Sequence, residues 1–445
     1  MKRDRLHVLK ANLRACRKAV RDLREKALTA TGALTRSVVG YDKPLPTGIW
    51  RPFSRRLYSD NATAEVWLVS PEDGHFMHTF FDVDPISPGG RYLVATRVPF
   101  IWRVPYVGDE CQVCVIDLES ERYLPVYTSR GWGSQLGCNA QWLDENTVLC
   151  NDVFEGRGAG VKIEISTGRV ERLEGPIYGL SPDKKYSYSG SIDLINLSQT
   201  GYGVPEPLFG TRYPSRGYES SEGVWRTDLA TGKRSLILSL EQIRNALPDQ
   251  EELATGDYFV QNVKVSPSGD RLLIVVFSRR VRGRLGWPVQ VVTCRPDGSD
   301  VSLALHDRDY RKGGHHPNWL PSGRDILMNL RPDGRTMRFC VVDPVTREFR
   351  VLLPGAKGGG HPSVHQNRLL TDAYVTEGFS DAAGRVPIRL IDLETQSEQE
   401  ICRVFTKNLT GGRRVDPHPV WTCDGDVVFN GVVDGRRQIY LARIK

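Results

Sequence analysis

The chain has 445 residues, of which 40% are hydrophobic and 25% charged, the composition of a soluble globular protein. Its net charge of +7 comes from one end, because residues 1–28 contain ten of the 60 basic residues and three of the 53 acidic ones. The remaining chain is neutral, which excludes the basic surface that nucleic-acid binding requires. No apolar run reaches the roughly 18 residues of a membrane span, and the start lacks a secretory apolar block, so we expect a cytoplasmic protein.

Residues 1–45 are predicted to form a basic amphipathic helix and a linker. Apolar residues recur at alternating intervals of three and four, at Leu6, Leu9, Leu13, Cys16, Val20, Leu23 and Ala27. The Pro-rich stretch YDKPLPTGIWRPFSRR that follows is typical of a linker. The apolar stripe could dock on the body of the protein or on the same helix of a second copy. Alternatively, its arginine-rich face could lie on an anionic membrane surface.

From residue 64 the pattern is that of an all-β protein, with short apolar runs separated by Gly, Asp, Asn, Ser and Pro. One further helix is predicted near 239–247. A phrase of strand, tight turn and strand recurs seven times, beginning at Asp82, Gly137, Ile177, Gln261, His315, Gly360 and Asp416. Two more strands follow most copies, as in VCVIDLESERYLPVY. Four antiparallel strands in each period of about 40–57 residues are the unit of a β-propeller, so residues 46–445 are predicted to form seven blades.

The first and last strands of the propeller are predicted to complete one blade together. The seventh phrase ends in QIYLARIK and lacks an outer strand, whereas the strand near 64–70 has no phrase of its own. Pairing of these two segments would close the ring and remove its exposed edges. A long interval at 197–223, rich in Gly, Pro, Tyr and Arg, predicts a functional loop on one face.

A His-Pro pair stands in three consecutive phrases, at His316, His361 and His418. The first strand of each propeller blade lines the central channel, so these side chains are expected to converge. The proline after each one fixes the backbone where strand pairing has not begun, and holds the preceding side chain in one orientation. Three imidazoles beside Asp416 suit a divalent metal site or a general base next to one. The alternative is that they only bond neighbouring loops.

The phrases around these histidines resemble the last blades of oligogalacturonate lyase, a seven-bladed propeller that cleaves uronate-containing oligosaccharides by β-elimination. They resemble the propeller ulvan lyases more loosely, and the turn phrase is similar to the Tol-system propeller repeat. The likeness covers residues 64–445. It implies that His316, three residues before Trp319, is the base. It also implies that a divalent metal such as Mn, Zn or Ca binds to His361, Asp416 and His418.

Two positions depart from the lyase pattern. Asp416 replaces an imidazole ligand, which favours a harder ion. Arg413 replaces a glutamine and cannot be a ligand.

β-Elimination requires a cation against the uronate carboxylate, because negative charge builds there as the base removes the neighbouring proton. Metal or arginine can supply it, and the candidate arginines are Arg212, Arg216 and Arg331. His316 would remove the ring C5 proton, and the candidates that would protonate the departing oxygen are His315, Tyr202 and Tyr218. His78, just before the first phrase, is a further candidate in the same ring.

Two functions follow from this pattern. One is a lyase of an acidic oligosaccharide or polysaccharide, without an organic cofactor, since the chain has no phosphate loop, serine-hydrolase elbow or zincin motif. The other is a propeller without catalysis that presents its rim to a protein or glycan partner. Catalysis requires His316, His361 and His418 to face one cavity with an arginine within reach.

Overall fold

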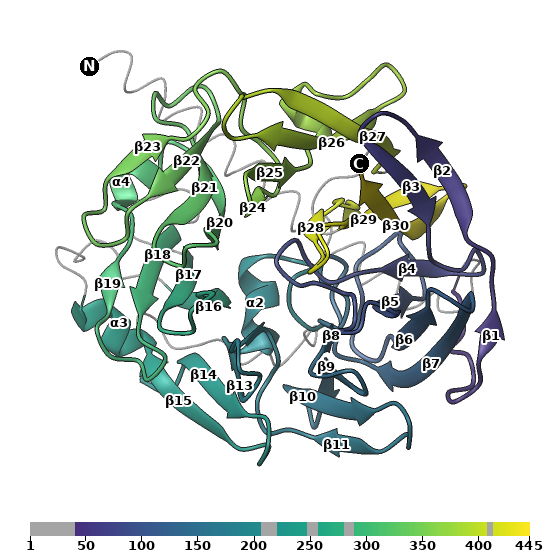
Figure 1. The fold of residues 1–445 in the computed structure, drawn as a ribbon. Coiled ribbons are helices and arrows are strands. Elements are labelled where there is room, and N and C mark those ends of the chain that lie inside the picture. The colour runs from purple at the N-terminus through teal and green to yellow at the C-terminus, as the bar shows by residue number, and fades with distance from the viewer. Residues whose placement is uncertain (1–40, 206–219, 247–256, 280–288, 407–412) are drawn as a thin grey trace.

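The computed structural model describes residues 41–205, 220–246, 257–279, 289–406 and 413–445. The helix predicted at the amino terminus lies outside these ranges. Antiparallel strands dominate the described chain, and their sheets are arranged around a common centre (Figure 1). The prediction of an all-β chain is confirmed.

Five sheets follow one another along the chain. The first contains β4 (His75–Met77), β5 (Tyr92–Val98), β6 (Cys111–Asp117) and β7 (Arg122–Ser129), with β1 (Arg51–Pro52) paired to β7. The second contains β8 (Gln141–Trp142), β9 (Thr147–Phe154), β10 (Arg157–Glu164) and β11 (Val170–Arg172). The third contains β12 (Gly179–Leu180), β13 (Tyr186–Ser189), β14 (Gly223–Asp228) and β15 (Arg234–Ser239). The fourth contains β16 (Asp257–Val265), β17 (Leu272–Arg279), β18 (Val289–Cys294) and β19 (Ser302–Leu303). The fifth contains β20 (Gly314–Trp319), β21 (Ile326–Leu330), β22 (Arg338–Val342) and β23 (Phe349–Val351).

The remaining strands form one nine-stranded sheet that consists of two groups. One group is β24 (Ser363–His365), β25 (Arg368–Thr371), β26 (Arg385–Asp392) and β27 (Glu398–Phe405). The other is β28 (Val420–Trp421), β29 (Val427–Val433), β30 (Arg436–Ile444), β3 (Ala64–Leu68) and β2 (Arg56–Asp60). A single residue pair, Phe405 with Val432, joins the two groups. Strand β3 pairs antiparallel with β30 along its whole length, so strands from the two ends of the described chain lie side by side (Figure 1).

Tight turns in the sequence set the hairpins. Asp434 and Gly435 connect β29 to β30 with φ values of 49° and 75°, and Glu155 and Gly156 connect β9 to β10 with 51° and 76°. Two consecutive residues with positive φ match the right-handed twist of the flanking strands, which is why glycine occupies the second position of both turns.

The sheets bury apolar side chains on both faces. In β6, Cys111 packs in a cluster with Trp132 and Val148, whereas Cys114 packs in a different cluster with Val428. Residues three apart on a strand point to opposite faces, so each sheet contributes to two neighbouring interfaces.

Within the described ranges, three short α-helices, α2 (Ile192–Ser198), α3 (Leu240–Ala246) and α4 (Asp307–Tyr310), and one 3-10 helix, η3 (Val375–Glu377), connect the strands. Helix α3 confirms the helix predicted near 239–247. The expectation of only one further helix is wrong: the β-branched and polar residues of α2, IDLINLS, are also typical of strands and loops, and α4 has only four residues, too few for a helical period. Helix α2 packs Ile192 and Ile195 against Phe80 in a central apolar cluster. None of the described helices is long and apolar enough to cross a membrane.

Candidate active site

Three histidines from three neighbouring groups of strands meet near the centre of the molecule. His316 lies in β20, His361 precedes β24, and His418 precedes β28. The ring centroids of His316 and His361 are 3.9 Å apart, and those of His361 and His418 are 4.4 Å apart. His361 and His418 are fully buried, whereas His316 is half-buried. The structure thus brings the three predicted rings together, with His316 on the more open side.

A β-bulge directs His316 toward this cluster. The pairing of β20 with β21 begins at Gly314 and shifts register between His315 and Asn318, so that His316 and Pro317 stand opposite one residue. The expectation that pairing has not begun at this proline is therefore wrong, and the bulge accommodates the missing N–H instead. The φ values of His316 and His418 are 57° and 48°, a strained region for residues other than glycine. Strain of this kind concentrates at functional sites.

Asp372 holds His361 in one orientation. The Nδ1 atom of His361 lies 2.9 Å from Oδ1 of Asp372, and its backbone N donates to the same oxygen at 2.7 Å. Because the carboxylate accepts a hydrogen bond from the Nδ1–H group, Nε2 of His361 carries a lone pair. Gly360 permits this close approach: its φ is +61°, and a Cβ atom there would lie 2.1 Å from the carbonyl oxygen of Asp372.

His361, Asp416 and His418 form a group suited to a cation. Their ligand atoms all lie within 4.8 Å of one another, and all three residues are buried. Among the described residues, neither ring nitrogen of His418 has a hydrogen-bond partner. The Oδ2 atom of Asp416 is 3.7 Å from its Nε2 atom, too far for such a bond. A buried imidazole without a partner is unfavourable, and a coordinated cation would satisfy it. Two nitrogens and one carboxylate therefore fit a divalent ion.

Arg414 links the acid of this group to Tyr202. Its Nε donates to Oδ2 of Asp416 at 2.6 Å, and its Nη2 donates to the Tyr202 hydroxyl at 2.9 Å. Although burial alone would raise the pKa of Asp416, the charge of Arg414 and the contact with His418 hold that pKa well below its usual range. Asp416 is therefore ionised at neutral pH. Tyr202 is 7% exposed, and burial raises its pKa to about 12.

His316 and Tyr374 place an unprotonated imidazole nitrogen next to a hydroxyl group. The Nδ1 atom of His316 lies 2.7 Å from the carbonyl oxygen of Gly360, which can only accept, so Nδ1 carries the proton and Nε2 is unprotonated. The Tyr374 hydroxyl lies 3.3 Å from Nε2 of His316 and 3.3 Å from Nε2 of His361. His315 approaches from the other side, with its Nδ1 atom 2.8 Å from Nδ1 of His316.

Burial keeps these imidazoles neutral. It lowers the pKa of His315 to about 4, aided by the charges of Arg331 and Arg414. It also lowers the pKa values of His316 and His361 well below the usual value, and that of His418 in the same direction. Neutral imidazoles can accept a proton or bind a metal at neutral pH.

Two phenylalanines fill the space next to the rings. Phe80 lies 4.7 Å from the ring of His418, and Phe81 lies 5.2 Å from that of His361, between centroids. Phe81 also contacts Lys264, whose Nζ atom is 4.1 Å from its centroid. Both phenylalanines are almost fully buried, whereas His315, His316 and Tyr374 are partly exposed.

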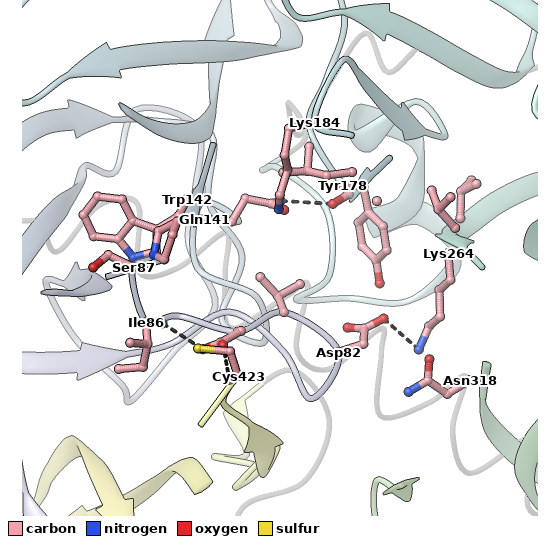
Figure 2. Close-up of a pocket in the computed structure, with 17 residues that line it drawn as sticks. Asp82, Ile86, Ser87, Gln141, Trp142, Tyr178, Lys184, Lys264, Asn318 and Cys423 are labelled. Carbon is pink, nitrogen blue, oxygen red and sulfur yellow. Dashed lines mark hydrogen bonds and ion pairs between the residues drawn. The ribbon is translucent and has the colours of Figure 1, made fainter. Parts of the chain in front are cut away.

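Lys264 belongs to a separate cavity of about 320 Å³, shown in Figure 2. Its Nζ atom pairs with Oδ2 of Asp82 at 2.8 Å, and Tyr178, Lys184 and Asn318 complete much of the polar lining. The three histidines are absent from this lining. Phe81 contacts both Lys264 and His361, so it stands between the cavity and the histidine cluster.

The other predicted residues take different positions. The positive charge of Arg331 helps to lower the pKa of His315. Among the described residues, the buried Nε atom of Arg331 has no hydrogen-bond partner. His78 is buried next to His418 and Arg437, whose charges, after burial itself, lower its pKa to about 3. Arg212, Arg216 and Tyr218 lie outside the described residues.

Sequence reasoning missed five side chains of the cluster: Asp372, Tyr374, Arg414, Phe80 and Phe81. Asp372 and Tyr374 lie at the end of the repeated phrase that begins with Gly360. Arg414 lies two residues before the phrase that begins with Asp416. These three residues were therefore within reach of a comparison of the phrases and their flanking residues. Nothing in the local sequence places Phe80 among the histidines, because it reaches them from a loop of the first sheet.

Comparisons with known proteins agree with the architecture. No family model and no curated protein sequence matches the chain. Among solved structures, the chain is similar to oligogalacturonate lyase in complex with manganese, with a TM-score of 0.64 and 16% identity over 90% of this chain and 99% of that one. It is similar to an oligogalacturonate lyase from Vibrio parahaemolyticus, with a TM-score of 0.61 and 14% identity over 89% of this chain and 98% of that one. TolB from Acinetobacter baumannii has a TM-score of 0.40 at 12% identity, over 80% of this chain and 81% of that one.

These likenesses define the fold class. The chain has a β-propeller fold similar to that of oligogalacturonate lyase.

Proposed function

We propose that this protein is a lyase that cleaves a uronate-containing oligosaccharide or polysaccharide by β-elimination. The observation that carries the proposal is the pairing of two features at one place. A buried group suited to a divalent cation, made of His361, Asp416 and His418, adjoins an unprotonated imidazole nitrogen of His316. The propeller likeness to a lyase in complex with manganese supports the same conclusion.

We further infer that the propeller has seven blades. The nine-stranded sheet counts as two blades, because one residue pair alone connects its two groups. Strand β3 pairs with β30 and supplies an outer strand to the last group, which would close the ring. The helix proposed within residues 1–45 would be available for self-association or contact with a membrane surface, whereas Tyr41 and Leu45, at the end of this segment, pack against the core of the body.

The cation site would hold the uronate in place. His361, Asp416 and His418 would bind the ion, Mn, Zn or Ca, and Asp372 would keep Nε2 of His361 facing it. When bound, such an ion supplies positive charge that stabilises the carboxylate during proton removal. The positive charges of Arg331 and Arg414 act on His315, which is partly exposed, so both would stabilise a uronate carboxylate bound beside it.

Two side chains of the protein would remove and supply the protons of the reaction. His316 takes the C5 proton on Nε2 as the C4–O bond breaks and the C4–C5 double bond forms. The Tyr374 hydroxyl gives its proton to the departing oxygen, and burial raises its pKa well above the usual value, so that it is protonated beforehand. His316 then returns its proton to Tyr374 across the 3.3 Å contact. Tyr374 takes this role in preference to His315, because its hydroxyl lies beside Nε2 of His316, the nitrogen that takes the proton, whereas His315 lies beside Nδ1. Tyr202 donates no bond to His316 but is bound by Arg414, and Tyr218 lies outside the described residues.

A second function, a non-catalytic propeller that binds a protein or glycan, is favoured by one specific observation. Phe80 and Phe81 pack against the imidazoles, and Arg414 already occupies an oxygen of Asp416. If this arrangement leaves no room for a saccharide, the histidines serve only to join neighbouring blades.

Ultraviolet absorbance of the unsaturated uronate product distinguishes the two functions. The full-length protein is incubated with pectic, ulvan-like and glucuronate-containing glycans, with Mn, Zn or Ca added in turn. We expect absorbance to rise with at least one glycan, and to remain flat for His316→Gln but not for the control His365→Gln, whose half-buried ring packs on Trp421 and is not part of the cluster. Folded protein that yields no product on any glycan with any of these ions would favour the non-catalytic function.

A further inference from the structure

A second imidazole lies directly behind the proposed base. Nδ1 of His316 donates to the carbonyl oxygen of Gly360 at 2.7 Å, and Nδ1 of His315 lies 2.8 Å from the same nitrogen. Only one proton fits between the two nitrogens, and the carbonyl oxygen requires it on His316, so Nδ1 of His315 is an acceptor. Asn329 agrees with this assignment, because its Nδ2 atom also approaches Nδ1 of His315, at 3.3 Å. The orientation of this amide is fixed, since its oxygen accepts the backbone N–H of Gly359 at 2.9 Å.

The other nitrogen of His315 faces Glu377. Burial and the charges of Arg331 and Arg414 lower the pKa of His315 to about 4, so the ring is neutral and its one proton is on Nε2. The distance from Nε2 to Oε1 of Glu377 is 4.0 Å, which is too long for a hydrogen bond but allows an interaction between charges. The side chains of His315 and Glu377 are 25% and 17% exposed, so solvent screens this interaction only in part.

Glu377 also has a structural contact. Its Oε2 atom accepts the backbone N–H of Tyr374 at 2.9 Å, which caps the short helix η3. Gly359 leaves room for the carboxylate, because a Cβ atom there would lie 2.6 Å from Oε2. A cap requires an acceptor oxygen but no negative charge, so glutamine can replace glutamate in it. Substitution can therefore separate this contact from an effect of the charge.

We propose that Glu377 and His315 are positioning residues that stabilise positive charge on His316. The inference rests on the proposed lyase function, in which Nε2 of His316 takes the C5 proton. The ring then becomes positively charged, so its Nδ1–H group is a stronger donor to His315, and the carboxylate of Glu377 attracts the charge through the intervening ring. The Nδ1 proton stays on His316 throughout, and the proton from C5 passes to Tyr374 as described above.

The kinetics of Glu377→Gln separate the charge from the cap. Burial raises the pKa of Glu377 to about 7, so the measurements are made above that pH, where the carboxylate is ionised. On the glycan that the unmodified protein cleaves, we expect kcat to fall by about 10–100-fold with little change in KM. The matched control is Glu394→Gln, because Glu394 is exposed. An unchanged kcat in Glu377→Gln would overturn the proposal and leave Glu377 as a helix cap.

A double-mutant cycle tests whether the charge acts through His315. We expect Glu377→Gln to lower kcat in the unmodified protein but to have little further effect in a His315→Gln background, because the intervening ring is already absent. Equal losses in both backgrounds would show that Glu377 acts independently of His315, contrary to the proposal.

Nitrogen NMR of histidine-labelled protein tests the arrangement without turnover, so failure of this inference is distinct from failure of the lyase function. The spectra show which ring nitrogen carries the proton, and His315→Gln and His316→Gln assign the signals. We expect the proton on Nε2 of His315 and on Nδ1 of His316. A proton on Nδ1 of His315 would overturn the proposal. The expected tautomers in a protein that cleaves no glycan would support the pair and refute the lyase function.

Discussion

The Nδ1 atom of His361 lies 2.9 Å from the Oδ1 atom of Asp372, and both side chains are buried. This contact fixes which nitrogen of the imidazole faces the centre of the cluster. Asp372 also accepts the backbone N–H of His418 at 3.2 Å, so one carboxylate orients two of the three members of the proposed metal group.

Replacing Asp372 should therefore weaken metal binding without removing a ligand. We expect Asp372→Asn to reduce Mn affinity by about 10–100-fold, because the amide no longer enforces the Nδ1–H tautomer of His361. Isothermal titration of the full-length protein measures the change. Asp434→Asn is the control, since the side chain of Asp434 is 83% exposed. Equal affinities in the two variants would show that Asp372 does not position the ligands.

Replacing the proposed base or the proposed acid should lower the rate of the reaction without abolishing metal binding. We expect His316→Gln to lower kcat by about 10²–10⁴-fold, the range for loss of a general base. Tyr374→Phe should lower kcat as well, because the departing oxygen loses its proton donor. Both variants should still bind Mn, since neither residue belongs to the proposed ligands, with an affinity that changes by no more than about tenfold because both residues contact His361. Loss of metal binding in His316→Gln would argue that this histidine is itself a ligand.

The buried histidines should make the fold sensitive to acid. The pKa of His78 is about 3 in the folded protein against 6.5 ordinarily. A lowered folded-state pKa gives stability that is complete above pH 6.5 and is lost as the pH falls toward 3, because only the unfolded chain takes up the proton. One such histidine contributes a loss of about 2 kcal/mol between pH 7 and pH 5.

We therefore expect His78→Gln to have a free energy of unfolding that falls by about 2 kcal/mol less over that interval than in the unmodified protein. Chemical denaturation at pH 7 and pH 5 measures the difference, with His365→Gln as the control. Parallel pH profiles for His78→Gln and the unmodified protein would contradict a neutral, buried His78.

Gly360 should be irreplaceable for two separate reasons. Its φ of +61° strains any other residue, and a Cβ atom would collide with Asp372 at 2.1 Å. Gly334 has a similar φ of +71° with nothing within 4 Å of a Cβ atom, so Gly334→Ala isolates the backbone strain. We expect Gly334→Ala to cost about 1 kcal/mol of stability and Gly360→Ala at least about 3 kcal/mol. Similar losses of stability in the two variants, measured by denaturant unfolding, would mean that the backbone around Asp372 shifts to accommodate the added methyl group.

The repeated phrases predicted the sheets because each phrase carries its own apolar strands and turn residues, as the Asp434–Gly435 hairpin shows. The same repeats suggested that His316, His361 and His418 converge, since equivalent positions of a propeller face its axis. The bulge at His316 depends on the register of the β20–β21 hairpin, which the pattern of apolar residues does not record. Phe80 enters the cluster from a loop more than 200 residues away from His316 along the chain. Its presence therefore had no local signal.

The antiparallel alignment of Ala64 with Ile444 has a consequence for how the molecule is made. Strand β30 connects β29 with β3, so this connection cannot form until Arg436–Ile444 have been synthesised. Phe80 comes from the first sheet and His418 from the last one. The histidine cluster is thus assembled late, after the intervening sheets have emerged from the ribosome.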